Sequence, residues 1–287
     1  MEPHIGILGF GEAGHAFAQG WKTPRVAAFD IKGRAAIMAR AKSVDITACG
    51  SLADLGPAAL VFSLVTADQV VCAAQSFAQH IKRNTLYFDG NSCAPETKRR
   101  AASVIENAGG RYVDMAILAP VLPKLHQTPA IICGPHAAAG LAVLTHLNMS
   151  AATIAGDIGA AAAVKMIRSV IVKGFEAVTM EATLAGARAG VLDAVLASLE
   201  HSDPDFGWTG RASYTLERMT RHGTRRAAEM REAVATVQEL GVNARMSKAT
   251  VDWQAVIGAL ELQLNDGGSL KHACKILAAL ERGAKSD

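Results

Sequence analysis

Three glycines near the start of the chain have the spacing of a phosphate-binding turn. They follow the apolar run of residues 5–8 and precede a helical pattern of small residues. A tight turn through Gly9 would bring Gly11 to a point where any side chain obstructs a ligand, while Gly14 would let the new helix pack close to the strand. Free N–H groups at a helix N-terminus attract a pyrophosphate. The stretch therefore predicts a dinucleotide-binding turn made of Gly9, Phe10, Gly11, Glu12, Ala13 and Gly14.

An acidic residue stands where the second strand of such a fold ends. Asp30 lies 21 residues after Gly9, which suits a carboxylate that accepts hydrogen bonds from the adenosine ribose. Its charge would repel a 2′-phosphate and so favours NAD over NADP, although Lys32 in the same loop would suit adenine stacking or a phosphate. Two alternatives stay open. In the first, the glycines form only a tight turn and Asp30 caps a helix. In the second, the glycine turn and the acidic second strand belong to a methyltransferase.

Polar residues follow two further predicted strands, at the edge where ligands of open α/β sheets bind. Asn91 and Ser92 come after the fifth strand, so we expect them beside the crevice at this edge. The alternative is a polar turn that caps the helix beginning at Pro95. From the end of the fourth strand, we expect the cofactor site to be lined by Ser63, Leu64 and Val65.

A long apolar helix expected at residues 160–190 carries three polar side chains on one face. Lys165, Ser169 and Lys173 are four residues apart, and each step of four advances only about 40° around a helix. Such a stripe suggests the lining of a cleft. The alternative is that both lysines extend their ammonium groups to solvent.

A later basic segment offers candidate contacts for an anion. His222, Arg225 and Arg226 stand close together in the sequence, and the forked guanidinium group suits carboxylate or phosphate. The alternative is ordinary helix electrostatics, with Arg225 and Glu229 paired on a solvated face.

Short apolar runs alternate with Ala-rich helical segments up to about residue 155, which predicts a parallel sheet covered on both faces. Helices between the strands include residues 67–81 and 95–108. Repeated units of this kind indicate a doubly wound α/β fold of the Rossmann type. Eight strands are expected, at residues 5–8, 26–29, 45–48, 60–64, 86–88, 112–115, 130–133 and 151–154.

After Gly156 the sequence has no strand pattern and predicts helices only. We therefore expect a dinucleotide-binding domain at residues 1–156 and an all-α domain at residues 157–287, joined by the long helix. The helices expected beyond the long one are residues 192–199, 212–222, 224–240, 246–264 and 270–282.

Bulk composition narrows the class of protein. The chain has 29 Lys and Arg against 26 Asp and Glu, with no long basic block for nucleic acid, and the small excess lies in clusters at residues 98–100 and 221–226. Five dispersed cysteines lack metal-ligand spacing, so we expect no metal site and a reducing cytoplasm. Residues 1–3 precede the first predicted strand directly, so we expect no signal peptide, and no apolar window reaches a membrane-spanning length.

Four segments, taken in order, resemble the β-hydroxyacid dehydrogenase and 6-phosphogluconate dehydrogenase superfamily, in a poorly characterised branch. They are GFGEAG, FDGNSCAP, VDMAILAPV and GAAAAVKMIRSVIVKG. The resemblance implies a dinucleotide domain joined to an all-α substrate and dimerisation domain, and a homodimer. It also implies that Lys165 is the catalytic lysine, with Asn91 and Ser92 near the nicotinamide and the substrate.

The departures from the superfamily pattern bear on the substrate. Arg168 stands where the pattern has His, Ser169 where it has Asn, and Val172 where decarboxylating members have Glu. Leu122 and Pro123 replace residues of the usual substrate loop. We therefore do not expect a phosphogluconate decarboxylase.

The expected function is reversible, nicotinamide-dependent oxidation of a small anionic hydroxy acid or sugar acid. Lys165 would exchange a proton with the substrate hydroxyl. An ordinary lysine pKa of about 10.4 is too high for a base at neutral pH, so burial or a cation such as Arg168 must lower it. The alternatives are an NADPH-dependent imine or ketone reductase and a non-catalytic NAD-binding sensor. The expected substrate contacts are Asn91, Ser92, Ser169, Lys173, His222, Arg225 and Arg226.

Overall fold

The computed structural model describes residues 5–21, 25–42, 44–265 and 267–283, so the expectation about residues 1–3 falls outside the described residues. The chain divides into two compact units, Met1–Met166 and Ile167–Asp287, called unit 1 and unit 2 below. This division lies inside helix α6 (Ala160–Arg188), later than the boundary expected at residue 156. In the described ranges no helix combines the length and the apolar character needed to cross a bilayer.

Unit 1 is built on an eight-stranded sheet with the strand order β3-β2-β1-β4-β5-β6-β7-β8. The chain order reverses between β1 and β4, and a sheet of this kind opens a crevice for ligands at such a switch point. Each of the eight predicted runs overlaps a strand. The strands are β1 (Ile5–Leu8), β2 (Val26–Phe29), β3 (Thr47–Ala48), β4 (Leu60–Ser63), β5 (Leu86–Asp89), β6 (Arg111–Ile117), β7 (Ala130–Cys133) and β8 (Ala151–Thr153).

The sheet is mostly parallel, as predicted, but its last two strands run against the other six. β7 pairs antiparallel with β6, and β8 pairs parallel with β7. A parallel neighbour normally requires a crossover helix, but the connection of residues 118–129 contains only the short 3-10 helix η3 (Leu125–Gln127).

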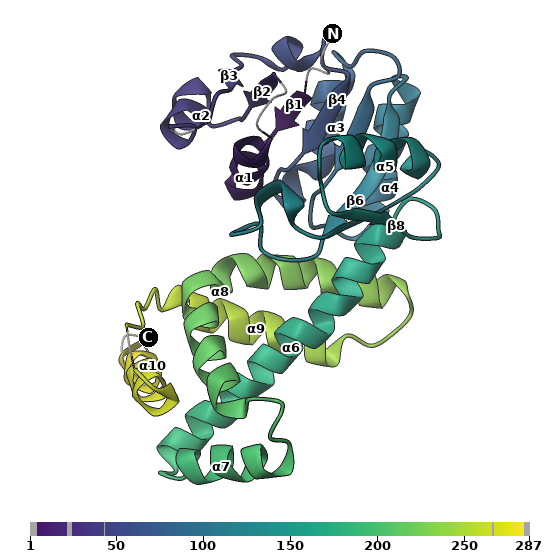
Figure 1. Cartoon of the computed structure of the whole chain (residues 1–287). Helices are drawn as coiled ribbons and strands as arrows, with labels where there is room; N and C mark the ends of the chain where they lie inside the picture. Colours follow the sequence, from purple (N-terminus) through teal and green to yellow (C-terminus); the bar gives the residue numbers. More distant parts are fainter. Residues whose placement is uncertain (1–4, 22–24, 43, 266, 284–287) are drawn as a thin grey trace. The chain divides into compact units, whose positions relative to one another are not determined.

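Helices cover both faces of this sheet (Figure 1). One face packs against α1, α2 and α5, through side chains such as Phe17 and Leu144. The other face packs against α3 and α4, through Phe77 and Ile105. Because both faces are covered, the strands are apolar along their length rather than alternating. The helices are α1 (Glu12–Gly20), α2 (Arg34–Arg40), α3 (Val70–Ala78), α4 (Pro95–Asn107) and α5 (Ala137–His146).

Unit 2, in the part that the structure describes, contains helices and no strand. Its apolar core joins Met180 of α6, Met219 of α8, Ile257 of α9 and Ile276 of α10. Besides most of α6, the unit contains α7 (Leu192–Ser202), α8 (Trp208–Glu239), α9 (Arg245–Ala259) and α10 (Ser269–Gly283).

Helix α8 runs unbroken through Gly223, where the sequence predicted a break between two helices. The glycine is needed because α9 crosses α8 at this point. A Cβ at Gly223 would lie 2.4 Å from the backbone oxygen of Gln254, and a Cβ at Gly258 would lie 2.2 Å from the backbone nitrogen of Thr224. Contact between the two backbones therefore outweighs the low helix propensity of glycine.

We expect Gly223→Ala to lower the free energy of unfolding by about 1–3 kcal/mol, because the added Cβ overpacks the helix crossing. Gly210→Ala is the matched control in the same helix, since a Cβ there meets nothing within 4 Å. This control should raise the free energy by about 0.5–1 kcal/mol, because alanine loses less backbone entropy than glycine. Urea denaturation measures both values, and equal effects of the two substitutions would contradict the close crossing.

Candidate active site

The predicted glycine turn joins β1 to α1 at the carboxyl edge of the sheet. Gly9 has a φ of +92°, and a Cβ there would lie 2.7 Å from the backbone oxygen of Leu64. A Cβ at Gly14 would lie 2.7 Å from the backbone oxygen of Gly9, whereas a Cβ at Gly11 meets nothing within 4 Å. Gly9 and Gly14 are thus required by the packing of the turn, while Gly11 leaves open space outside it.

Asp30 lies against this turn. Its Oδ2 accepts a hydrogen bond from the N–H of Phe10 at 2.9 Å, and its Oδ1 accepts one from the N–H of Lys32 at 2.9 Å. Helix α1 begins after Gly11, which has no side chain to cap the N–H groups of the first turn. Uncapped donors at a helix N-terminus next to a fixed carboxylate fit the pyrophosphate and ribose of a dinucleotide.

Asn91 links the loop after β5 to the end of β4. Its Oδ1 accepts the N–H of Val65 at 2.6 Å, and its Nδ2 donates to Ser63 Oγ at 3.0 Å and to Asp89 Oδ1 at 2.6 Å. The structure therefore brings together the strand ends that the sequence placed at one edge. Both N–H groups of the Asn91 amide are used inside the protein, and the neighbouring Ser92 is half-buried.

Sequence reasoning missed a buried charge network beside this loop. The sequence showed Lys98 only as part of a local cluster of basic residues, whereas its side chain is fully buried. Its Nζ lies 2.9 Å from Asp89 Oδ1 and 3.3 Å from Asp114 Oδ1. A signal for burial was present, because Lys98 shares one face of α4 with the buried residues Ala101 and Ile105 at helical spacing.

Attraction to the carboxylates decides the charge of Lys98. Burial lowers the pKa of this ammonium, but Asp89 and Asp114 outweigh burial and raise the pKa above its ordinary value. The hydroxyl of Tyr112 donates to Asp89 Oδ2 at 2.6 Å, and burial followed by the nearby carboxylate raises the pKa of Tyr112 well above its ordinary value. The network thus contains one ammonium, two carboxylates and a neutral phenol.

Asp114 extends this network to the start of α6. Its Oδ2 accepts the N–H of Gly159 at 2.9 Å and that of Ala162 at 3.3 Å, an arrangement that also suits the helix dipole. Cys133 donates from Sγ to the same oxygen at 3.3 Å, and burial followed by Asp114 raises its pKa to about 11, which keeps the thiol neutral. Lys165 lies one turn beyond Ala162 and is half-buried.

The polar face of α6 continues in unit 2 as contacts with α8. Lys173 Nζ lies 2.8 Å from Glu229 Oε2 and donates to Ser169 Oγ at 3.3 Å. Burial lowers the pKa of Lys173, and attraction to Glu229 opposes that change. Ser169 and Lys173 are therefore neighbours as expected, and the ammonium of Lys173 is paired within the unit.

The three candidate anion contacts on α8 are not gathered in one cluster. Arg226 is 5% exposed and donates to Glu176 Oε2, which fixes α8 to α6. Arg225 is exposed, with its Nε 3.9 Å from Glu229 Oε1, and His222 is half-buried. Arg226 is thus buried in an ion pair of unit 2, while the side chain of Arg225 is exposed.

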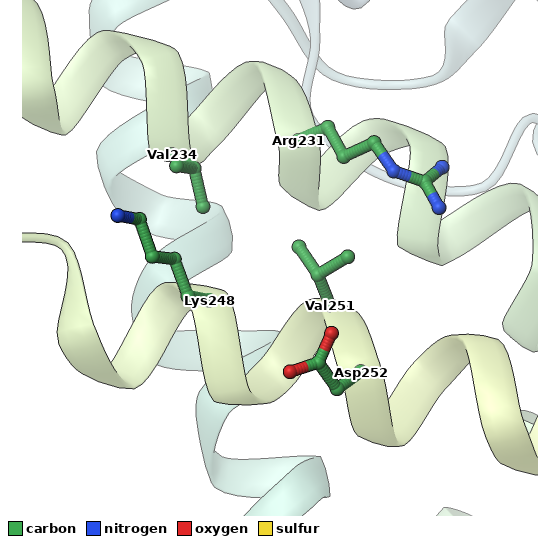
Figure 2. A pocket seen from close by; sticks show the side chains of 5 residues that line it. All are labelled: Arg231, Val234, Lys248, Val251 and Asp252. Atoms are coloured by element: carbon green, nitrogen blue, oxygen red, sulfur yellow. The ribbon is translucent and has the colours of Figure 1, made fainter.

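A groove of about 320 Å³ lies elsewhere in unit 2, between α8 and α9 (Figure 2). None of the predicted site residues lines it. Nor do the described residues include a group of three or more His, Cys, Asp or Glu side chains placed to hold a metal ion. The groove is lined by Arg231, Val234, Lys248, Val251 and Asp252.

Comparison with known proteins finds relatives along the whole chain. A family described only as a domain of unknown function, DUF1932, matches residues 187–257. A conserved hypothetical protein from Sinorhizobium meliloti 1021 has a solved structure that is 33% identical, with a TM-score of 0.77, covering 96% of this chain and 97% of that one.

Two further solved structures share the fold. The conserved protein MTH1747, of unknown function and described as structurally similar to 3-hydroxyacid dehydrogenases, is 27% identical, with a TM-score of 0.73 and coverage of 95% and 98% of the two chains. A 3-hydroxyisobutyrate dehydrogenase from Mycobacterium tuberculosis, solved with L-serine, has a TM-score of 0.76 at 15% identity, covering 97% of this chain and 99% of that one.

We expect Lys98→Met to lower the free energy of unfolding by about 3–5 kcal/mol, because it leaves two buried carboxylates without their cation. Lys82→Met is the control, since Lys82 is exposed and a surface change of this kind costs within about 0.5 kcal/mol. Denaturant titration of both variants and the wild type measures the difference.

The comparison of the wild type with Lys98→Met also tests whether folding raises or lowers the pKa of Lys98. A group whose pKa is raised in the folded state contributes its full stabilisation at any pH below the ordinary value of 10.5. This stabilisation is lost as the pH rises from that value through the folded pKa. The stability difference between wild type and Lys98→Met should therefore stay constant from about pH 8 to 10 and narrow at higher pH. A stability difference that instead widens as the pH rises from neutral towards 10 would show that the folded pKa of Lys98 is lowered.

Proposed function

Because this chain belongs to the β-hydroxyacid dehydrogenase and 6-phosphogluconate dehydrogenase superfamily, we propose that it is an NAD(P)-dependent oxidoreductase acting on a small hydroxy acid or sugar acid. The observation that carries the proposal is the glycine turn of residues 9–14, to which Asp30 is hydrogen-bonded at the switch point of the sheet.

The turn and its surroundings suit a nicotinamide dinucleotide. The N–H groups at the start of α1 would bind the pyrophosphate, and Asp30 would accept hydrogen bonds from the adenosine ribose. Since the carboxylate of Asp30 repels a 2′-phosphate, NAD should bind more tightly than NADP. When bound, the nicotinamide ring supplies the acceptor or donor of a hydride. The remaining contacts are assigned to Lys32, Ser63, Leu64 and Val65.

Lys165 is the proposed acid and base. In the oxidative direction its amine would accept the hydroxyl proton while the hydride leaves the same carbon with both bonding electrons. In the reductive direction its ammonium would return that proton to the carbonyl oxygen. The N–H of Ala162, one turn earlier, is bonded to the buried Asp114, which gives Lys165 a fixed support.

The candidate substrate contacts divide by burial, since Lys173 and Arg226 are each 5% exposed while the others outside Asn91 are half-buried or exposed. The ion pairs of Lys173 and Arg226 with carboxylates of the same unit support a role in joining α6 to α8. The remaining side chains offer hydroxyl and cationic donors that suit the oxygens of a hydroxy acid. The proposed substrate contacts are therefore Ser92, Ser169, His222 and Arg225.

We expect Lys165→Met to lower kcat by about 10²–10⁴-fold, the usual contribution of general acid–base catalysis. Nucleotide affinity should stay unchanged, because the substitution removes the proton acceptor and leaves the glycine turn intact. Nicotinamide absorbance follows turnover across short hydroxy acids and aldonic acids. Lys248→Met is the control, since Lys248 is exposed on α9. Turnover by Lys165→Met at the wild-type rate would show that Lys165 is not the general acid and base.

The substrate panel also separates the competing activities. Turnover of ketone and amine mixtures with NADPH, but of no hydroxy acid with either nucleotide, would point to an imine reductase. Nucleotide binding without turnover on any of these substrates would point to a sensor.

A further inference from the structure

We propose that Lys98 and Asp114 are positioning residues, which with Asp89 fix the start of α6, and hence Lys165, to the loops at the carboxyl edge of the sheet. The inference rests on the proposed function, because it concerns how the acid and base of that reaction is held. It concerns side chains of unit 1 only.

A continuous run of side-chain contacts carries the argument. It begins at the N–H of Val65, which donates to Asn91, and passes through Asn91 to Asp89. Lys98 then lies between Asp89 and Asp114, with Nζ to carboxylate distances of 2.9 and 3.3 Å. The four side chains in this run are 0–3% exposed. The run therefore links β4, β5, α4 and β6 by buried charged and polar groups.

The run ends on the first turn of α6. Asp114 accepts the N–H groups of Gly159 and Ala162, so one carboxylate holds two points of that turn. The same turn packs on the start of α4, since a Cβ at Gly159 would lie 3.1 Å from Pro95 Cβ. Lys165 follows Ala162 by one turn, so the direction of the helix at Ala162 sets where the backbone of Lys165 lies.

The charges of the network suit a restraint of this kind. Two carboxylates face one ammonium, which leaves one negative charge in excess, and Asp114 lies beside the positive end of the α6 dipole. Charged hydrogen bonds in buried surroundings are strong because water does not compete for them. Neutralising Asp114 should therefore loosen the first turn of α6 without changing the glycine turn, which contains none of these side chains.

The test compares Asp114→Asn with the wild type in backbone hydrogen exchange, nucleotide affinity and turnover. We expect the backbone amides of residues 159–166 to exchange about tenfold faster, the effect of weakening a charged hydrogen bond. The Kd for NAD should stay at the wild-type value. The kcat should fall about 10- to 100-fold with an unchanged KM for the nucleotide, because the misplaced group is the proton acceptor.

Thr85→Val is the matched control. Thr85 is 2% exposed and donates to the backbone oxygen of Ala58 at 3.0 Å, at the amino end of β5 rather than its carboxyl end. The substitution deletes a buried hydrogen bond in the same sheet, so it reproduces a general loss of stability. It should leave exchange at residues 159–166 and kcat at wild-type values.

Cys133→Ala keeps the proposal testable if Asp114→Asn does not fold. Cys133 Sγ accepts the N–H of Ala161 at 3.2 Å and contacts Asp114 Oδ2. Its removal should raise exchange at residues 159–166 about threefold, because a weaker contact to the same turn is lost. Wild-type exchange in this segment for every variant that folds, or an increase spread equally over unit 1, would overturn the positioning role.

Failure of the proposed function gives a different result. If the wild type binds neither NAD nor NADP, that function is wrong, yet the exchange of residues 159–166 still decides whether Asp114 restrains α6. If the wild type binds NAD and turns over a hydroxy acid, while Asp114→Asn has faster exchange and unchanged kcat, the restraint exists but does not position Lys165.

Discussion

A fully buried ammonium between two carboxylates is the interaction on which the arrangement of unit 1 depends. A buried charge is tolerated only when it is paired and hydrogen-bonded. Lys98 meets that condition through Asp89 at the end of β5 and Asp114 on β6, and Asp114 in turn holds the start of α6. These elements therefore cannot shift independently without exposing an unpaired charge to an apolar interior.

The same edge of the sheet contains a second, contrasting feature. The turn at Gly9 and Gly14 is closed by backbone contacts, while the position of Gly11 is open. Asp30 is bonded to that turn and so presents its carboxylate at a fixed place. A closed charge network beside an open turn combines rigid support with open space at Gly11, an arrangement that would suit the proposed hydride transfer.

Features encoded in short segments were predictable from the sequence. The turn and Asp30 are defined by spacing along the chain, and each predicted apolar run overlaps a strand. The partners of Lys98 come from two other elements, so the local sequence showed only a cluster of basic residues and not the buried ion pairs. Gly223 likewise indicated a break in α8, because the helix that crosses it belongs to a distant segment. Residue type alone could not show that Arg226 is buried while Arg225 is exposed.

The direction of β7 is set by the segment that connects it to β6, and the residues of the strand itself do not reveal it. The run of residues 130–133 predicts a strand in either direction, and only the lack of a crossover helix in residues 118–129 decides that it runs antiparallel to β6.

Isothermal titration of NAD and NADP into the wild type and Gly11→Val tests the central claim most directly. A Cβ at Gly11 meets nothing within 4 Å, so the variant should fold as the wild type does. The account predicts that the wild type binds NAD more tightly than NADP and that Gly11→Val binds neither. A wild type that binds no nicotinamide nucleotide, or a Gly11→Val variant that binds NAD unchanged, would contradict it.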